Sequence, residues 1–428
     1  MEQETINFRL HPTILNQNLR GVYCPDSFVI PDGIKYFDGN SLGPATLEGL
    51  ECLTRVTEEW KTLLVGGWMN AKIPWFFYAE TLAGMLAPVI GARPEEVGIQ
   101  NSTTINLHLL LSTFFKPKPG SKRNAILIED GAFPSDHYAI EGFLKLKRLN
   151  PKKHLRVVPR ENLILSEDRI IQEMREDVAL IILPSVLYQT GQLLDMKRLT
   201  LEAHSRGILI GFDCCHSVGI VNHDFSEYDP DFAFWSNYKW MNNGPGGPAG
   251  LYANKRHESK KPGLPGWFGN EKETQFDMVP LFKPADGAGR FQVSTPHILS
   301  MAPLEGSLNM YKRIGIQNIR EASLVLTDYM IYLIDTTCAD YEINIVTPRE
   351  HSSRGGAISF SHPNAAGINE ALKSRNIVGD YRQPNLVRLA PNPLYCSCVD
   401  VFELMEILRE IIETREYEKY SNKRGLVA

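Results

Sequence analysis

Between residues 125 and 240, short apolar runs alternate with segments of helical pattern, and this alternation constrains the fold more than any other feature. Apolar runs typical of buried strands cover 125–129, 178–183, 208–212 and 232–235. A helix is predicted over 195–206, and another opens near 132–138. Strands and helices that alternate in this way predict an α/β fold with a mainly parallel sheet.

A lysine and an aspartate follow two of these predicted strands. Lys239 lies between the 232–235 run and the glycine-rich turn at 244–247, and Asp213 comes directly after the 208–212 run. The carboxyl ends of parallel strands meet at one edge of a sheet, where ligands bind. Pyridoxal phosphate (PLP) needs these two groups, because a carboxylate pairs with its pyridinium nitrogen and a lysine amine forms the imine. The alternative at this point is a surface lysine that happens to follow a strand.

Two further positions suit an anion and a flat ring. Ser102 or Thr103 can cap a helix over 105–115, and a helix start with free amides binds anions, although an ordinary cap explains the pattern equally well. Phe133 lies at a strand-to-helix turn, where it packs in the core or stacks on a cofactor ring.

The remaining chain predicts a second, smaller domain. Residues 1–32 show no periodicity, helices are expected over 46–64 and 78–90, and the glycines before Trp68 place that residue in a loop. Beyond residue 300, helices are expected at 303–313, 319–333 and 399–415, with short strands at 357–360 and 387–389. We expect an N-terminal arm and packing segment in 1–60, a large PLP-binding domain in 61–300 and a small α+β domain in 301–428.

Composition excludes several classes of function. The chain has 428 residues and 45 basic against 50 acidic side chains, a net charge of −5, which argues against a nucleic-acid partner. No apolar stretch is long enough to cross a bilayer, and the polar N-terminus is unlike a signal peptide. The seven cysteines are odd in number and form no CxxC pair, so reduced thiols of a cytoplasmic protein are expected. Asp213 and His216 lack further ligands at metal-site spacing, and no metal is expected.

Eight segments, in one order along the chain, resemble those of the kynureninase family. They are FDGNSLGP at 37–44, NSTTINLHLL at 101–110, FPSDHYAIE at 133–141, GFDCCHSVG at 211–219, DFAFWSNYKWMNNGPGG at 231–247, PGWFGNE at 265–271, RFQVSTPHIL at 290–299 and VRLAPNPLY at 387–395. The resemblance implies a fold type I PLP enzyme, with helices on both faces of a mainly parallel sheet and a smaller C-terminal α+β domain. Departures from the family pattern include Asn237, Asn270 and the Cys214-Cys215 pair.

Site residues follow from the resemblance, position by position. It implies three catalytic residues: Lys239 holds PLP covalently, Asp213 faces the pyridinium nitrogen, and Tyr238 reaches the phosphate and takes part in proton transfer. Cofactor contacts are further implied for Thr103, Thr104, Phe133, Asp136, Ser185, His216, Trp267 and Thr295, the last two across a dimer interface. Substrate contacts are implied for Ser41, Trp68, Thr295 and Arg388, whose guanidinium binds the α-carboxylate.

The implied reaction is the hydrolytic cleavage of L-kynurenine to anthranilate and L-alanine by a homodimer with shared active sites. Trp68 and Thr295 match the pair in relatives that favour kynurenine over 3-hydroxykynurenine. Two alternatives stay open. A cysteine desulfurase-like or other β-eliminating enzyme would need a mobile catalytic cysteine, for which Cys338 is the one candidate in the C-terminal region before residue 357. A non-catalytic PLP-binding relative could lose Tyr238 or Arg388, and both are present.

Overall fold

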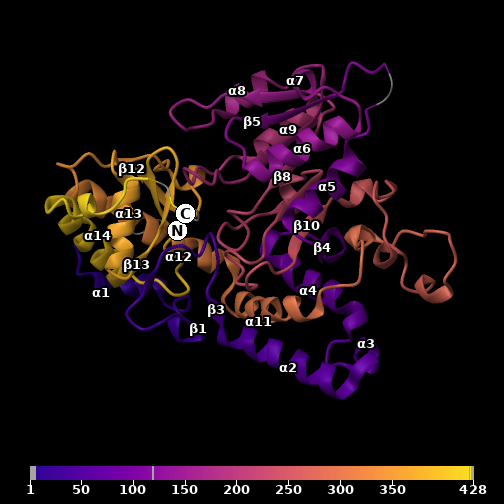
Figure 1. Cartoon of the computed structure of the whole chain (residues 1–428), viewed down its shortest axis with the longest axis horizontal. Coiled ribbons are helices and arrows are strands. Elements are labelled where there is room, and N and C mark those ends of the chain that lie inside the picture. Colours follow the sequence, from indigo (N-terminus) through magenta and orange to yellow (C-terminus); the bar gives the residue numbers. More distant parts are fainter. Residues whose placement is uncertain (1–5, 118–119, 424, 426–428) are drawn as a thin grey trace.

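The centre of the molecule is a seven-stranded sheet, which the computed structural model shows together with the rest of residues 6–117, 120–423 and 425 (Figure 1). Five neighbouring strands run parallel, as the alternating pattern predicts, and β10 is antiparallel to both β4 and β9. The strands, in spatial order, are β4 (Val97–Gln100), β10 (Ala249–Ala253), β9 (Phe232–Trp235), β8 (Leu209–Asp213), β7 (Val178–Pro184), β5 (Ala125–Glu129) and β6 (Leu155–Val158).

Helices cover both faces of this sheet because its strands are apolar on both sides. Ile126 and Ile128 of β5 belong to one buried cluster, whereas Leu127 between them belongs to the other. The first cluster includes side chains of α5 (Thr103–Phe114) and α6 (Pro134–Leu146). The second includes side chains of α4 (Tyr78–Leu86) and α9 (Met196–Ser205). Strands buried on both faces read as continuous apolar runs, which explains the pattern in the sequence.

The C-terminal part forms a separate, four-stranded antiparallel sheet at the left of Figure 1. Its strands, in spatial order, are β11 (Asn344–Ile345), β12 (Ile358–Ser361), β15 (Leu386–Leu389) and β14 (Asp380–Arg382). The helices of this part are α12 (Ile316–Thr337), α13 (Ala365–Ser374) and α14 (Cys398–Glu413). The register of β14 and β15 places Asp380 opposite Arg388, a pairing that matters for the site.

The N-terminal segment joins the two parts. Strand β2 (Lys35–Tyr36) pairs in parallel with β13 (Ile377–Val378) of the C-terminal part. Farther along, α2 (Leu47–Leu63) packs along α11 (Ile298–Ile314) at the lower edge of Figure 1. The expected domain boundary at residue 300 falls inside α11. The division of the chain into domains stays a prediction.

The structure corrects two local expectations. Trp68 lies in a short helix, α3 (Gly67–Asn70), not in a loop, because the Trp75 ring packs directly over Gly67 and holds its backbone in helical conformation. The N-terminal stretch is also less irregular than expected, since β1 (Phe28–Val29) pairs with β3 (Ala45–Thr46). The remaining short helices are α1 (Pro12–Leu15), α7 (Pro151–His154), α8 (Glu167–Gln172) and α10 (Phe225–Tyr228). Within the described residues no single helix has the length and apolarity to cross a membrane, although the bent pair 47–70 and 75–90 meets that test jointly.

Candidate active site

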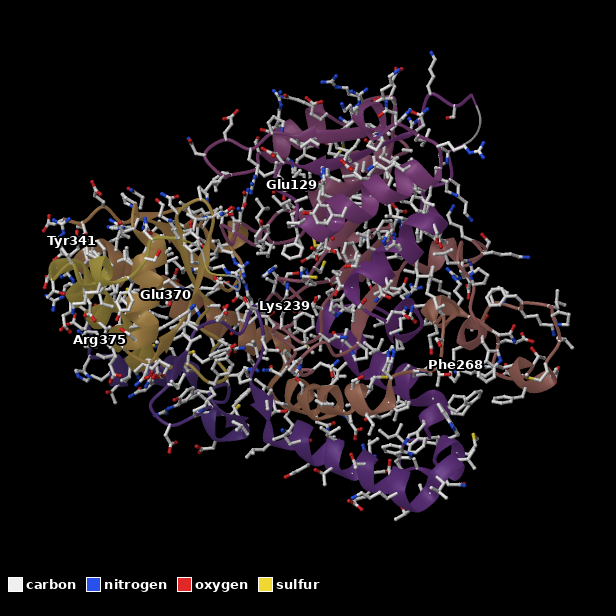
Figure 2. All side chains as sticks on the ribbon, viewed as in Figure 1. Glu129, Lys239, Phe268, Tyr341, Glu370 and Arg375 are labelled. Atoms are coloured by element: carbon white, nitrogen blue, oxygen red, sulfur yellow. The ribbon has the colours of Figure 1, made fainter. Side chains whose placement is uncertain are left out.

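A cavity of about 250 Å³ lies where the parallel strands of the large sheet end and the C-terminal part approaches it. Lys239 and Glu129, which Figure 2 labels, both line it. Nine of the residues expected at the site from sequence meet here: Ser41, Thr103, Thr104, Phe133, Asp136, Asp213, His216, Tyr238 and Lys239. They come from stretches of the chain that lie far apart in sequence, so the fold has gathered them.

Lys239 presents its amine to the cavity. Its Nζ lies 3.1 Å from Nε2 of His216 and 5.9 Å from the centroid of the Phe133 ring. Burial, reinforced by the positive charge of Lys239 and two arginines, holds the pKa of His216 well below its usual range. The imidazole is therefore neutral, and its Nε2 accepts a hydrogen bond from the lysine. A flat aromatic face and a positioned amine thus lie on neighbouring walls.

Two carboxyl groups share another wall. Asp213 ends β8, and its Oδ1 accepts a hydrogen bond of 2.8 Å from the backbone N–H of Cys215. Asp136 lies in the first turn of α6 and is buried. Burial and the adjacent Asp213 carboxylate raise the pKa of Asp136 well above its usual range. Asp136 therefore keeps a proton beside Asp213, since a second negative charge in that place would be costly.

The first turn of α5 offers an anion site. Its N-cap, Ser102, makes no side-chain capping hydrogen bond, which leaves the amides of this turn available. The Oγ1 of Thr103 lies 2.8 Å from Oγ of Ser236, and that of Thr104 lies 2.5 Å from Oγ of Ser135. The start of this 12-residue helix thus has free amides, two hydroxyls of its own and the hydroxyls of Ser135 and Ser236 beside it, which suits a phosphate group.

Two arginines lie at the side of the cavity that faces the C-terminal sheet. Arg388 is 1% exposed and does not line the cavity; its Nε and Nη2 donate to the two oxygens of Asp380 at 3.0 and 2.5 Å. Nη1 of Arg388 donates to the carbonyl of Tyr188 at 2.5 Å, and Nη2 also donates to Ser41 Oγ at 3.0 Å. Arg382 shares Asp380 with Arg388 but does line the cavity. Asp380 thus orients both guanidinium groups.

Four other expected residues also lie outside the cavity. Ser185 is fully buried behind Asp213, with its backbone N–H donating to the Asp213 carbonyl at 2.8 Å. Trp68 packs against Trp75 and Phe268, with ring centroids 5.9 and 6.1 Å away. Trp267 and Thr295 are exposed. Within one copy of the chain, none of the four reaches the cavity.

The cavity also contains residues that the sequence analysis missed. They are Glu129, Ser135, Tyr188, Cys215, Ser236 and Arg382, together with Asn40 and several apolar side chains. Ser135 and Ser236 stand inside segments already singled out, so their hydroxyls were a usable signal. Glu129 ends a predicted strand, as Asp213 does, and the same reasoning would have found it. Tyr188 and Arg382 belong to stretches without a pattern, and no local signal marks them.

The residues present fit PLP. A lysine amine, a carboxyl group at a strand end, an aromatic face and an uncapped helix start are the four groups that this cofactor requires, and all border the same cavity. Among the described residues no group of three His, Cys, Asp or Glu side chains is arranged to hold a metal ion. Cys338 is buried at the end of α12 and is absent from the cavity lining, so it does not have the mobile position that a desulfurase cysteine needs.

Solved structures similar to this one share the fold. The cystine C-S lyase C-DES, in complex with cysteine persulfide, matches with a TM-score of 0.78 and 18% identity over 89% of this chain and 98% of its own. A mutant of C-DES has glycine covalently linked to its PLP cofactor and gives the same TM-score of 0.78. Apo cysteine desulfurase from Thermococcus onnurineus NA1 has a TM-score of 0.76 and 18% identity, covering 91% of this chain and 97% of its own. At this identity the likeness shows the fold type I architecture alone.

Sequence relatives are far closer. Kynureninase from Geobacillus thermodenitrificans is 47% identical over 404 residues, and a kynureninase from Bacillus cereus is 49% identical over 402 residues, each covering 94% of both chains. Kynureninase from Shouchella clausii is 45% identical with the same coverage of 94%. The family model for the kynureninase C-terminal domain matches residues 319–408. With the PLP-type cavity and the fold type I architecture, these matches show that the chain belongs to the kynureninase family.

Proposed function

We propose that this chain is a PLP-dependent hydrolase that cleaves the Cβ–Cγ bond of L-kynurenine to give anthranilate and L-alanine, and that it also accepts 3-hydroxykynurenine. The observation that carries the proposal is the cavity itself, in which Lys239, Asp213 and the first turn of α5 surround one space in a chain 47% identical to a kynureninase. The activity places the enzyme in tryptophan catabolism, and the composition favours the cytoplasm.

The chain would hold the cofactor by four groups. Lys239 would bind it covalently through Nζ, Phe133 would cover the ring, Asp213 would keep a negative charge beside the ring nitrogen, and the α5 turn with Thr103 would bind the phosphate. When bound there, PLP supplies an electron sink that stabilises negative charge on the substrate carbons next to the amine.

Proton transfers fall to two neighbouring residues. The amine of Lys239, once released by the substrate, removes the proton from Cα and later returns one. Because His216 is neutral and accepts from Lys239 Nζ, it orients the amine without adding a competing positive charge. Tyr238 lines the cavity next to Lys239, and we assign to its hydroxyl the delivery of a proton to Cβ after the bond breaks. Water adds to the side-chain ketone, so the departing carbon leaves as a carboxylic acid.

The substrate carboxylate would bind on the arginine side. Arg388 matches the family position for this role, and Ser41, which accepts from its Nη2, lies in the cavity wall. Asp380 accepts from Nε and Nη2 of Arg388, which orients the guanidinium, and Nη1 would exchange the Tyr188 carbonyl for the substrate carboxylate. The aromatic end of the substrate would meet Trp68, Trp267 and Thr295 of a second copy.

A homodimer is part of this proposal. Trp267 is 45% exposed, and the loop after it exposes Phe276 at 64% and Met278 at 75%, which is unusual for large apolar side chains. This loop projects at the right of Figure 1, away from the two sheets. A second copy that covers it would bring Trp267 to the neighbouring cavity. Light scattering of the PLP-loaded protein tests the dimer, and a monomer at working concentration would contradict it.

One assay tests the reaction. Anthranilate fluorescence should rise when L-kynurenine is added to the PLP-loaded wild type and should stay flat with Lys239→Ala. The same protein should release no sulfide from L-cysteine, which separates kynureninase from the desulfurases that share its fold. Sulfide release without anthranilate would refute the proposed function.

A further inference from the structure

Glu129 is a buried carboxyl in the cavity that the proposed mechanism does not use. It ends β5, lines the cavity and is 2% exposed (Figure 2). Its Oε2 is buried and has no hydrogen-bond partner among the described residues. A carboxyl oxygen in that situation is costly when it is charged, so its position demands an explanation.

The charged neighbour of Glu129 is Arg160, and the pair is weak. Arg160 Nε lies 3.5 Å from Glu129 Oε2, and this Nε is itself buried without a hydrogen-bond partner in the described part of the chain. The guanidinium packs over Gly131 and donates from Nη1 to Gln189 Oε1 at 2.8 Å. Arg160 is therefore held by Gln189, and it lies within ion-pair distance of the Glu129 carboxyl without a hydrogen bond to it.

Three other titratable groups interact with Glu129: Asp130 follows it in the chain, Tyr188 comes from the segment after β7 and Asp136 from α6. Asp136 in turn adjoins Asp213 at the end of β8. Burial raises the pKa of Glu129 to about 8; Arg160 opposes this rise, and the charge of Asp130 adds to it. Burial outweighs the pairing because the two groups make no hydrogen bond, and Glu129 is neutral at pH 7.

Resting on the assignment of PLP to this cavity, we propose that Glu129 is a positioning residue of the cofactor site. With Asp136 and Asp213 it forms an array of three carboxyl groups that line one cavity, of which Glu129 and Asp136 are buried and protonated. Because Glu129 and Asp136 stay neutral, they add no negative charge beside Asp213, the carboxyl group that would face the ring nitrogen. Ionisation of Glu129 at alkaline pH would place a further negative charge in the array. Because Glu129 and Asp136 interact electrostatically, this charge would disturb the protonation of Asp136 beside Asp213 and weaken cofactor binding.

The test compares PLP affinity of apoprotein carrying Glu129→Gln with that of the wild type, near pH 6.5 and near pH 9.5. Glutamine keeps the size and permanent neutrality of the protonated acid. We expect equal Kd values at the lower pH and, at the higher pH, about tenfold tighter binding by the variant, since one like charge shifts a neighbouring equilibrium by about one pKa unit or more. Glu141→Gln, a partly exposed site on α6 paired with Lys145, is the matched control and should have the same Kd as the wild type at both pH values.

Infrared spectroscopy gives a readout independent of binding. Wild-type apoprotein should show a protonated-carboxyl carbonyl band that decreases between the two pH values, and Glu129→Gln should lack that decrease. If this variant does not fold, Arg160→Gln serves instead: loss of the guanidinium should move the midpoint of the wild-type decrease to higher pH. A Kd ratio that is the same at both pH values, or a midpoint that Arg160→Gln leaves unmoved, overturns the proposal. Wild type that binds no PLP overturns this inference and the proposed function together, whereas failure to cleave kynurenine with PLP bound touches only the proposed function.

Discussion

The buried carboxylate of Asp380 should be a major determinant of both stability and substrate affinity. It is 1% exposed and accepts from Nε and Nη2 of Arg388, from Nε and Nη2 of Arg382 at 3.0 and 2.6 Å, and from Ser41 Oγ at 3.2 Å. Although burial alone would raise its pKa, the two guanidinium groups hold the pKa of Asp380 below its usual range. Asp380→Asn keeps the shape of the side chain and removes the charge.

The magnitude follows from what the substitution leaves behind. Arg388 is 1% exposed, and without Asp380 it loses the carboxylate that it hydrogen-bonds, with Asp38 left as the nearby carboxyl group; removing the partner of a buried charge costs about 3–5 kcal/mol of stability. Because the folded-state pKa of Asp380 is depressed, its contribution is complete above the unfolded pKa of about 3.9 and is lost as the pH falls through the lower folded value. The difference in stability between variant and wild type should therefore be present at pH 7 and shrink in acid.

Denaturant unfolding of the apoprotein near pH 7, followed by circular dichroism, measures this cost. Asp335→Asn is the control, because Asp335 makes a similar two-point pair with Arg349 at 2.6 and 2.8 Å while 44% exposed. The control should cost at most about 1 kcal/mol. In kinetics, Asp380→Asn should raise the KM for kynurenine, since Arg388 loses its orientation. If Asp380→Asn lowered the free energy of unfolding by no more than the control does, the buried Asp380–Arg388 pair would not be a major determinant of stability.

The remaining predictions concern the proposed chemistry. Lys239→Ala should abolish turnover and the PLP adduct that borohydride otherwise traps, and an adduct that survives in the variant would disprove the covalent role. Asp213→Asn should leave the circular dichroism spectrum intact but lower kcat by orders of magnitude, because an amide cannot stabilise a pyridinium proton; activity within a few-fold of wild type would contradict that role. Arg388→Ala should weaken substrate binding by about 2–4 kcal/mol, read as KM, and an unchanged KM would assign the carboxylate to another group. The wild type should have a kcat/KM about ten- to a hundredfold higher for kynurenine than for 3-hydroxykynurenine, and the double variant Trp68→His with Thr295→Asn should narrow or reverse that ratio; a clear wild-type advantage for the hydroxylated substrate would show that these two positions do not set the choice.

Local sequence patterns predict much of the fold. The apolar runs at 125–129 and 232–235 coincide with β5 and β9 as the structure has them, because strands buried on both faces need continuous apolar sequence. Boundaries were less accurate where packing decides them: α11 begins at Ile298, five residues before the predicted start, and keeps Pro303 inside. The glycines before Trp68 predict a loop, yet Trp68 lies in the short helix α3, where its contact with Trp75 favours a helical turn.

In the candidate site, too, local sequence pattern predicts some residues and tertiary packing decides the others. Lys239 and Asp213 were found from sequence because each follows an apolar strand, and parallel strands end at one edge whatever the rest of the chain does. Arg382, Tyr188 and Ser41 come from parts of the chain far apart in sequence, and only the packing of the C-terminal sheet and the N-terminal segment against the large sheet brings them together.

By itself, then, the sequence determined the parallel sheet, the strand ends and the family, since these depend on short-range periodicity and on motifs that are read in order. Only the tertiary structure decided which groups share a low-dielectric space. Glu129 is an ordinary acid at a strand end until Asp136, Asp213 and a weakly paired Arg160 surround it. The protonation of Glu129 and Asp136 depends on distances and burial among side chains that no local pattern encodes, and these arise when the strands and helices pack.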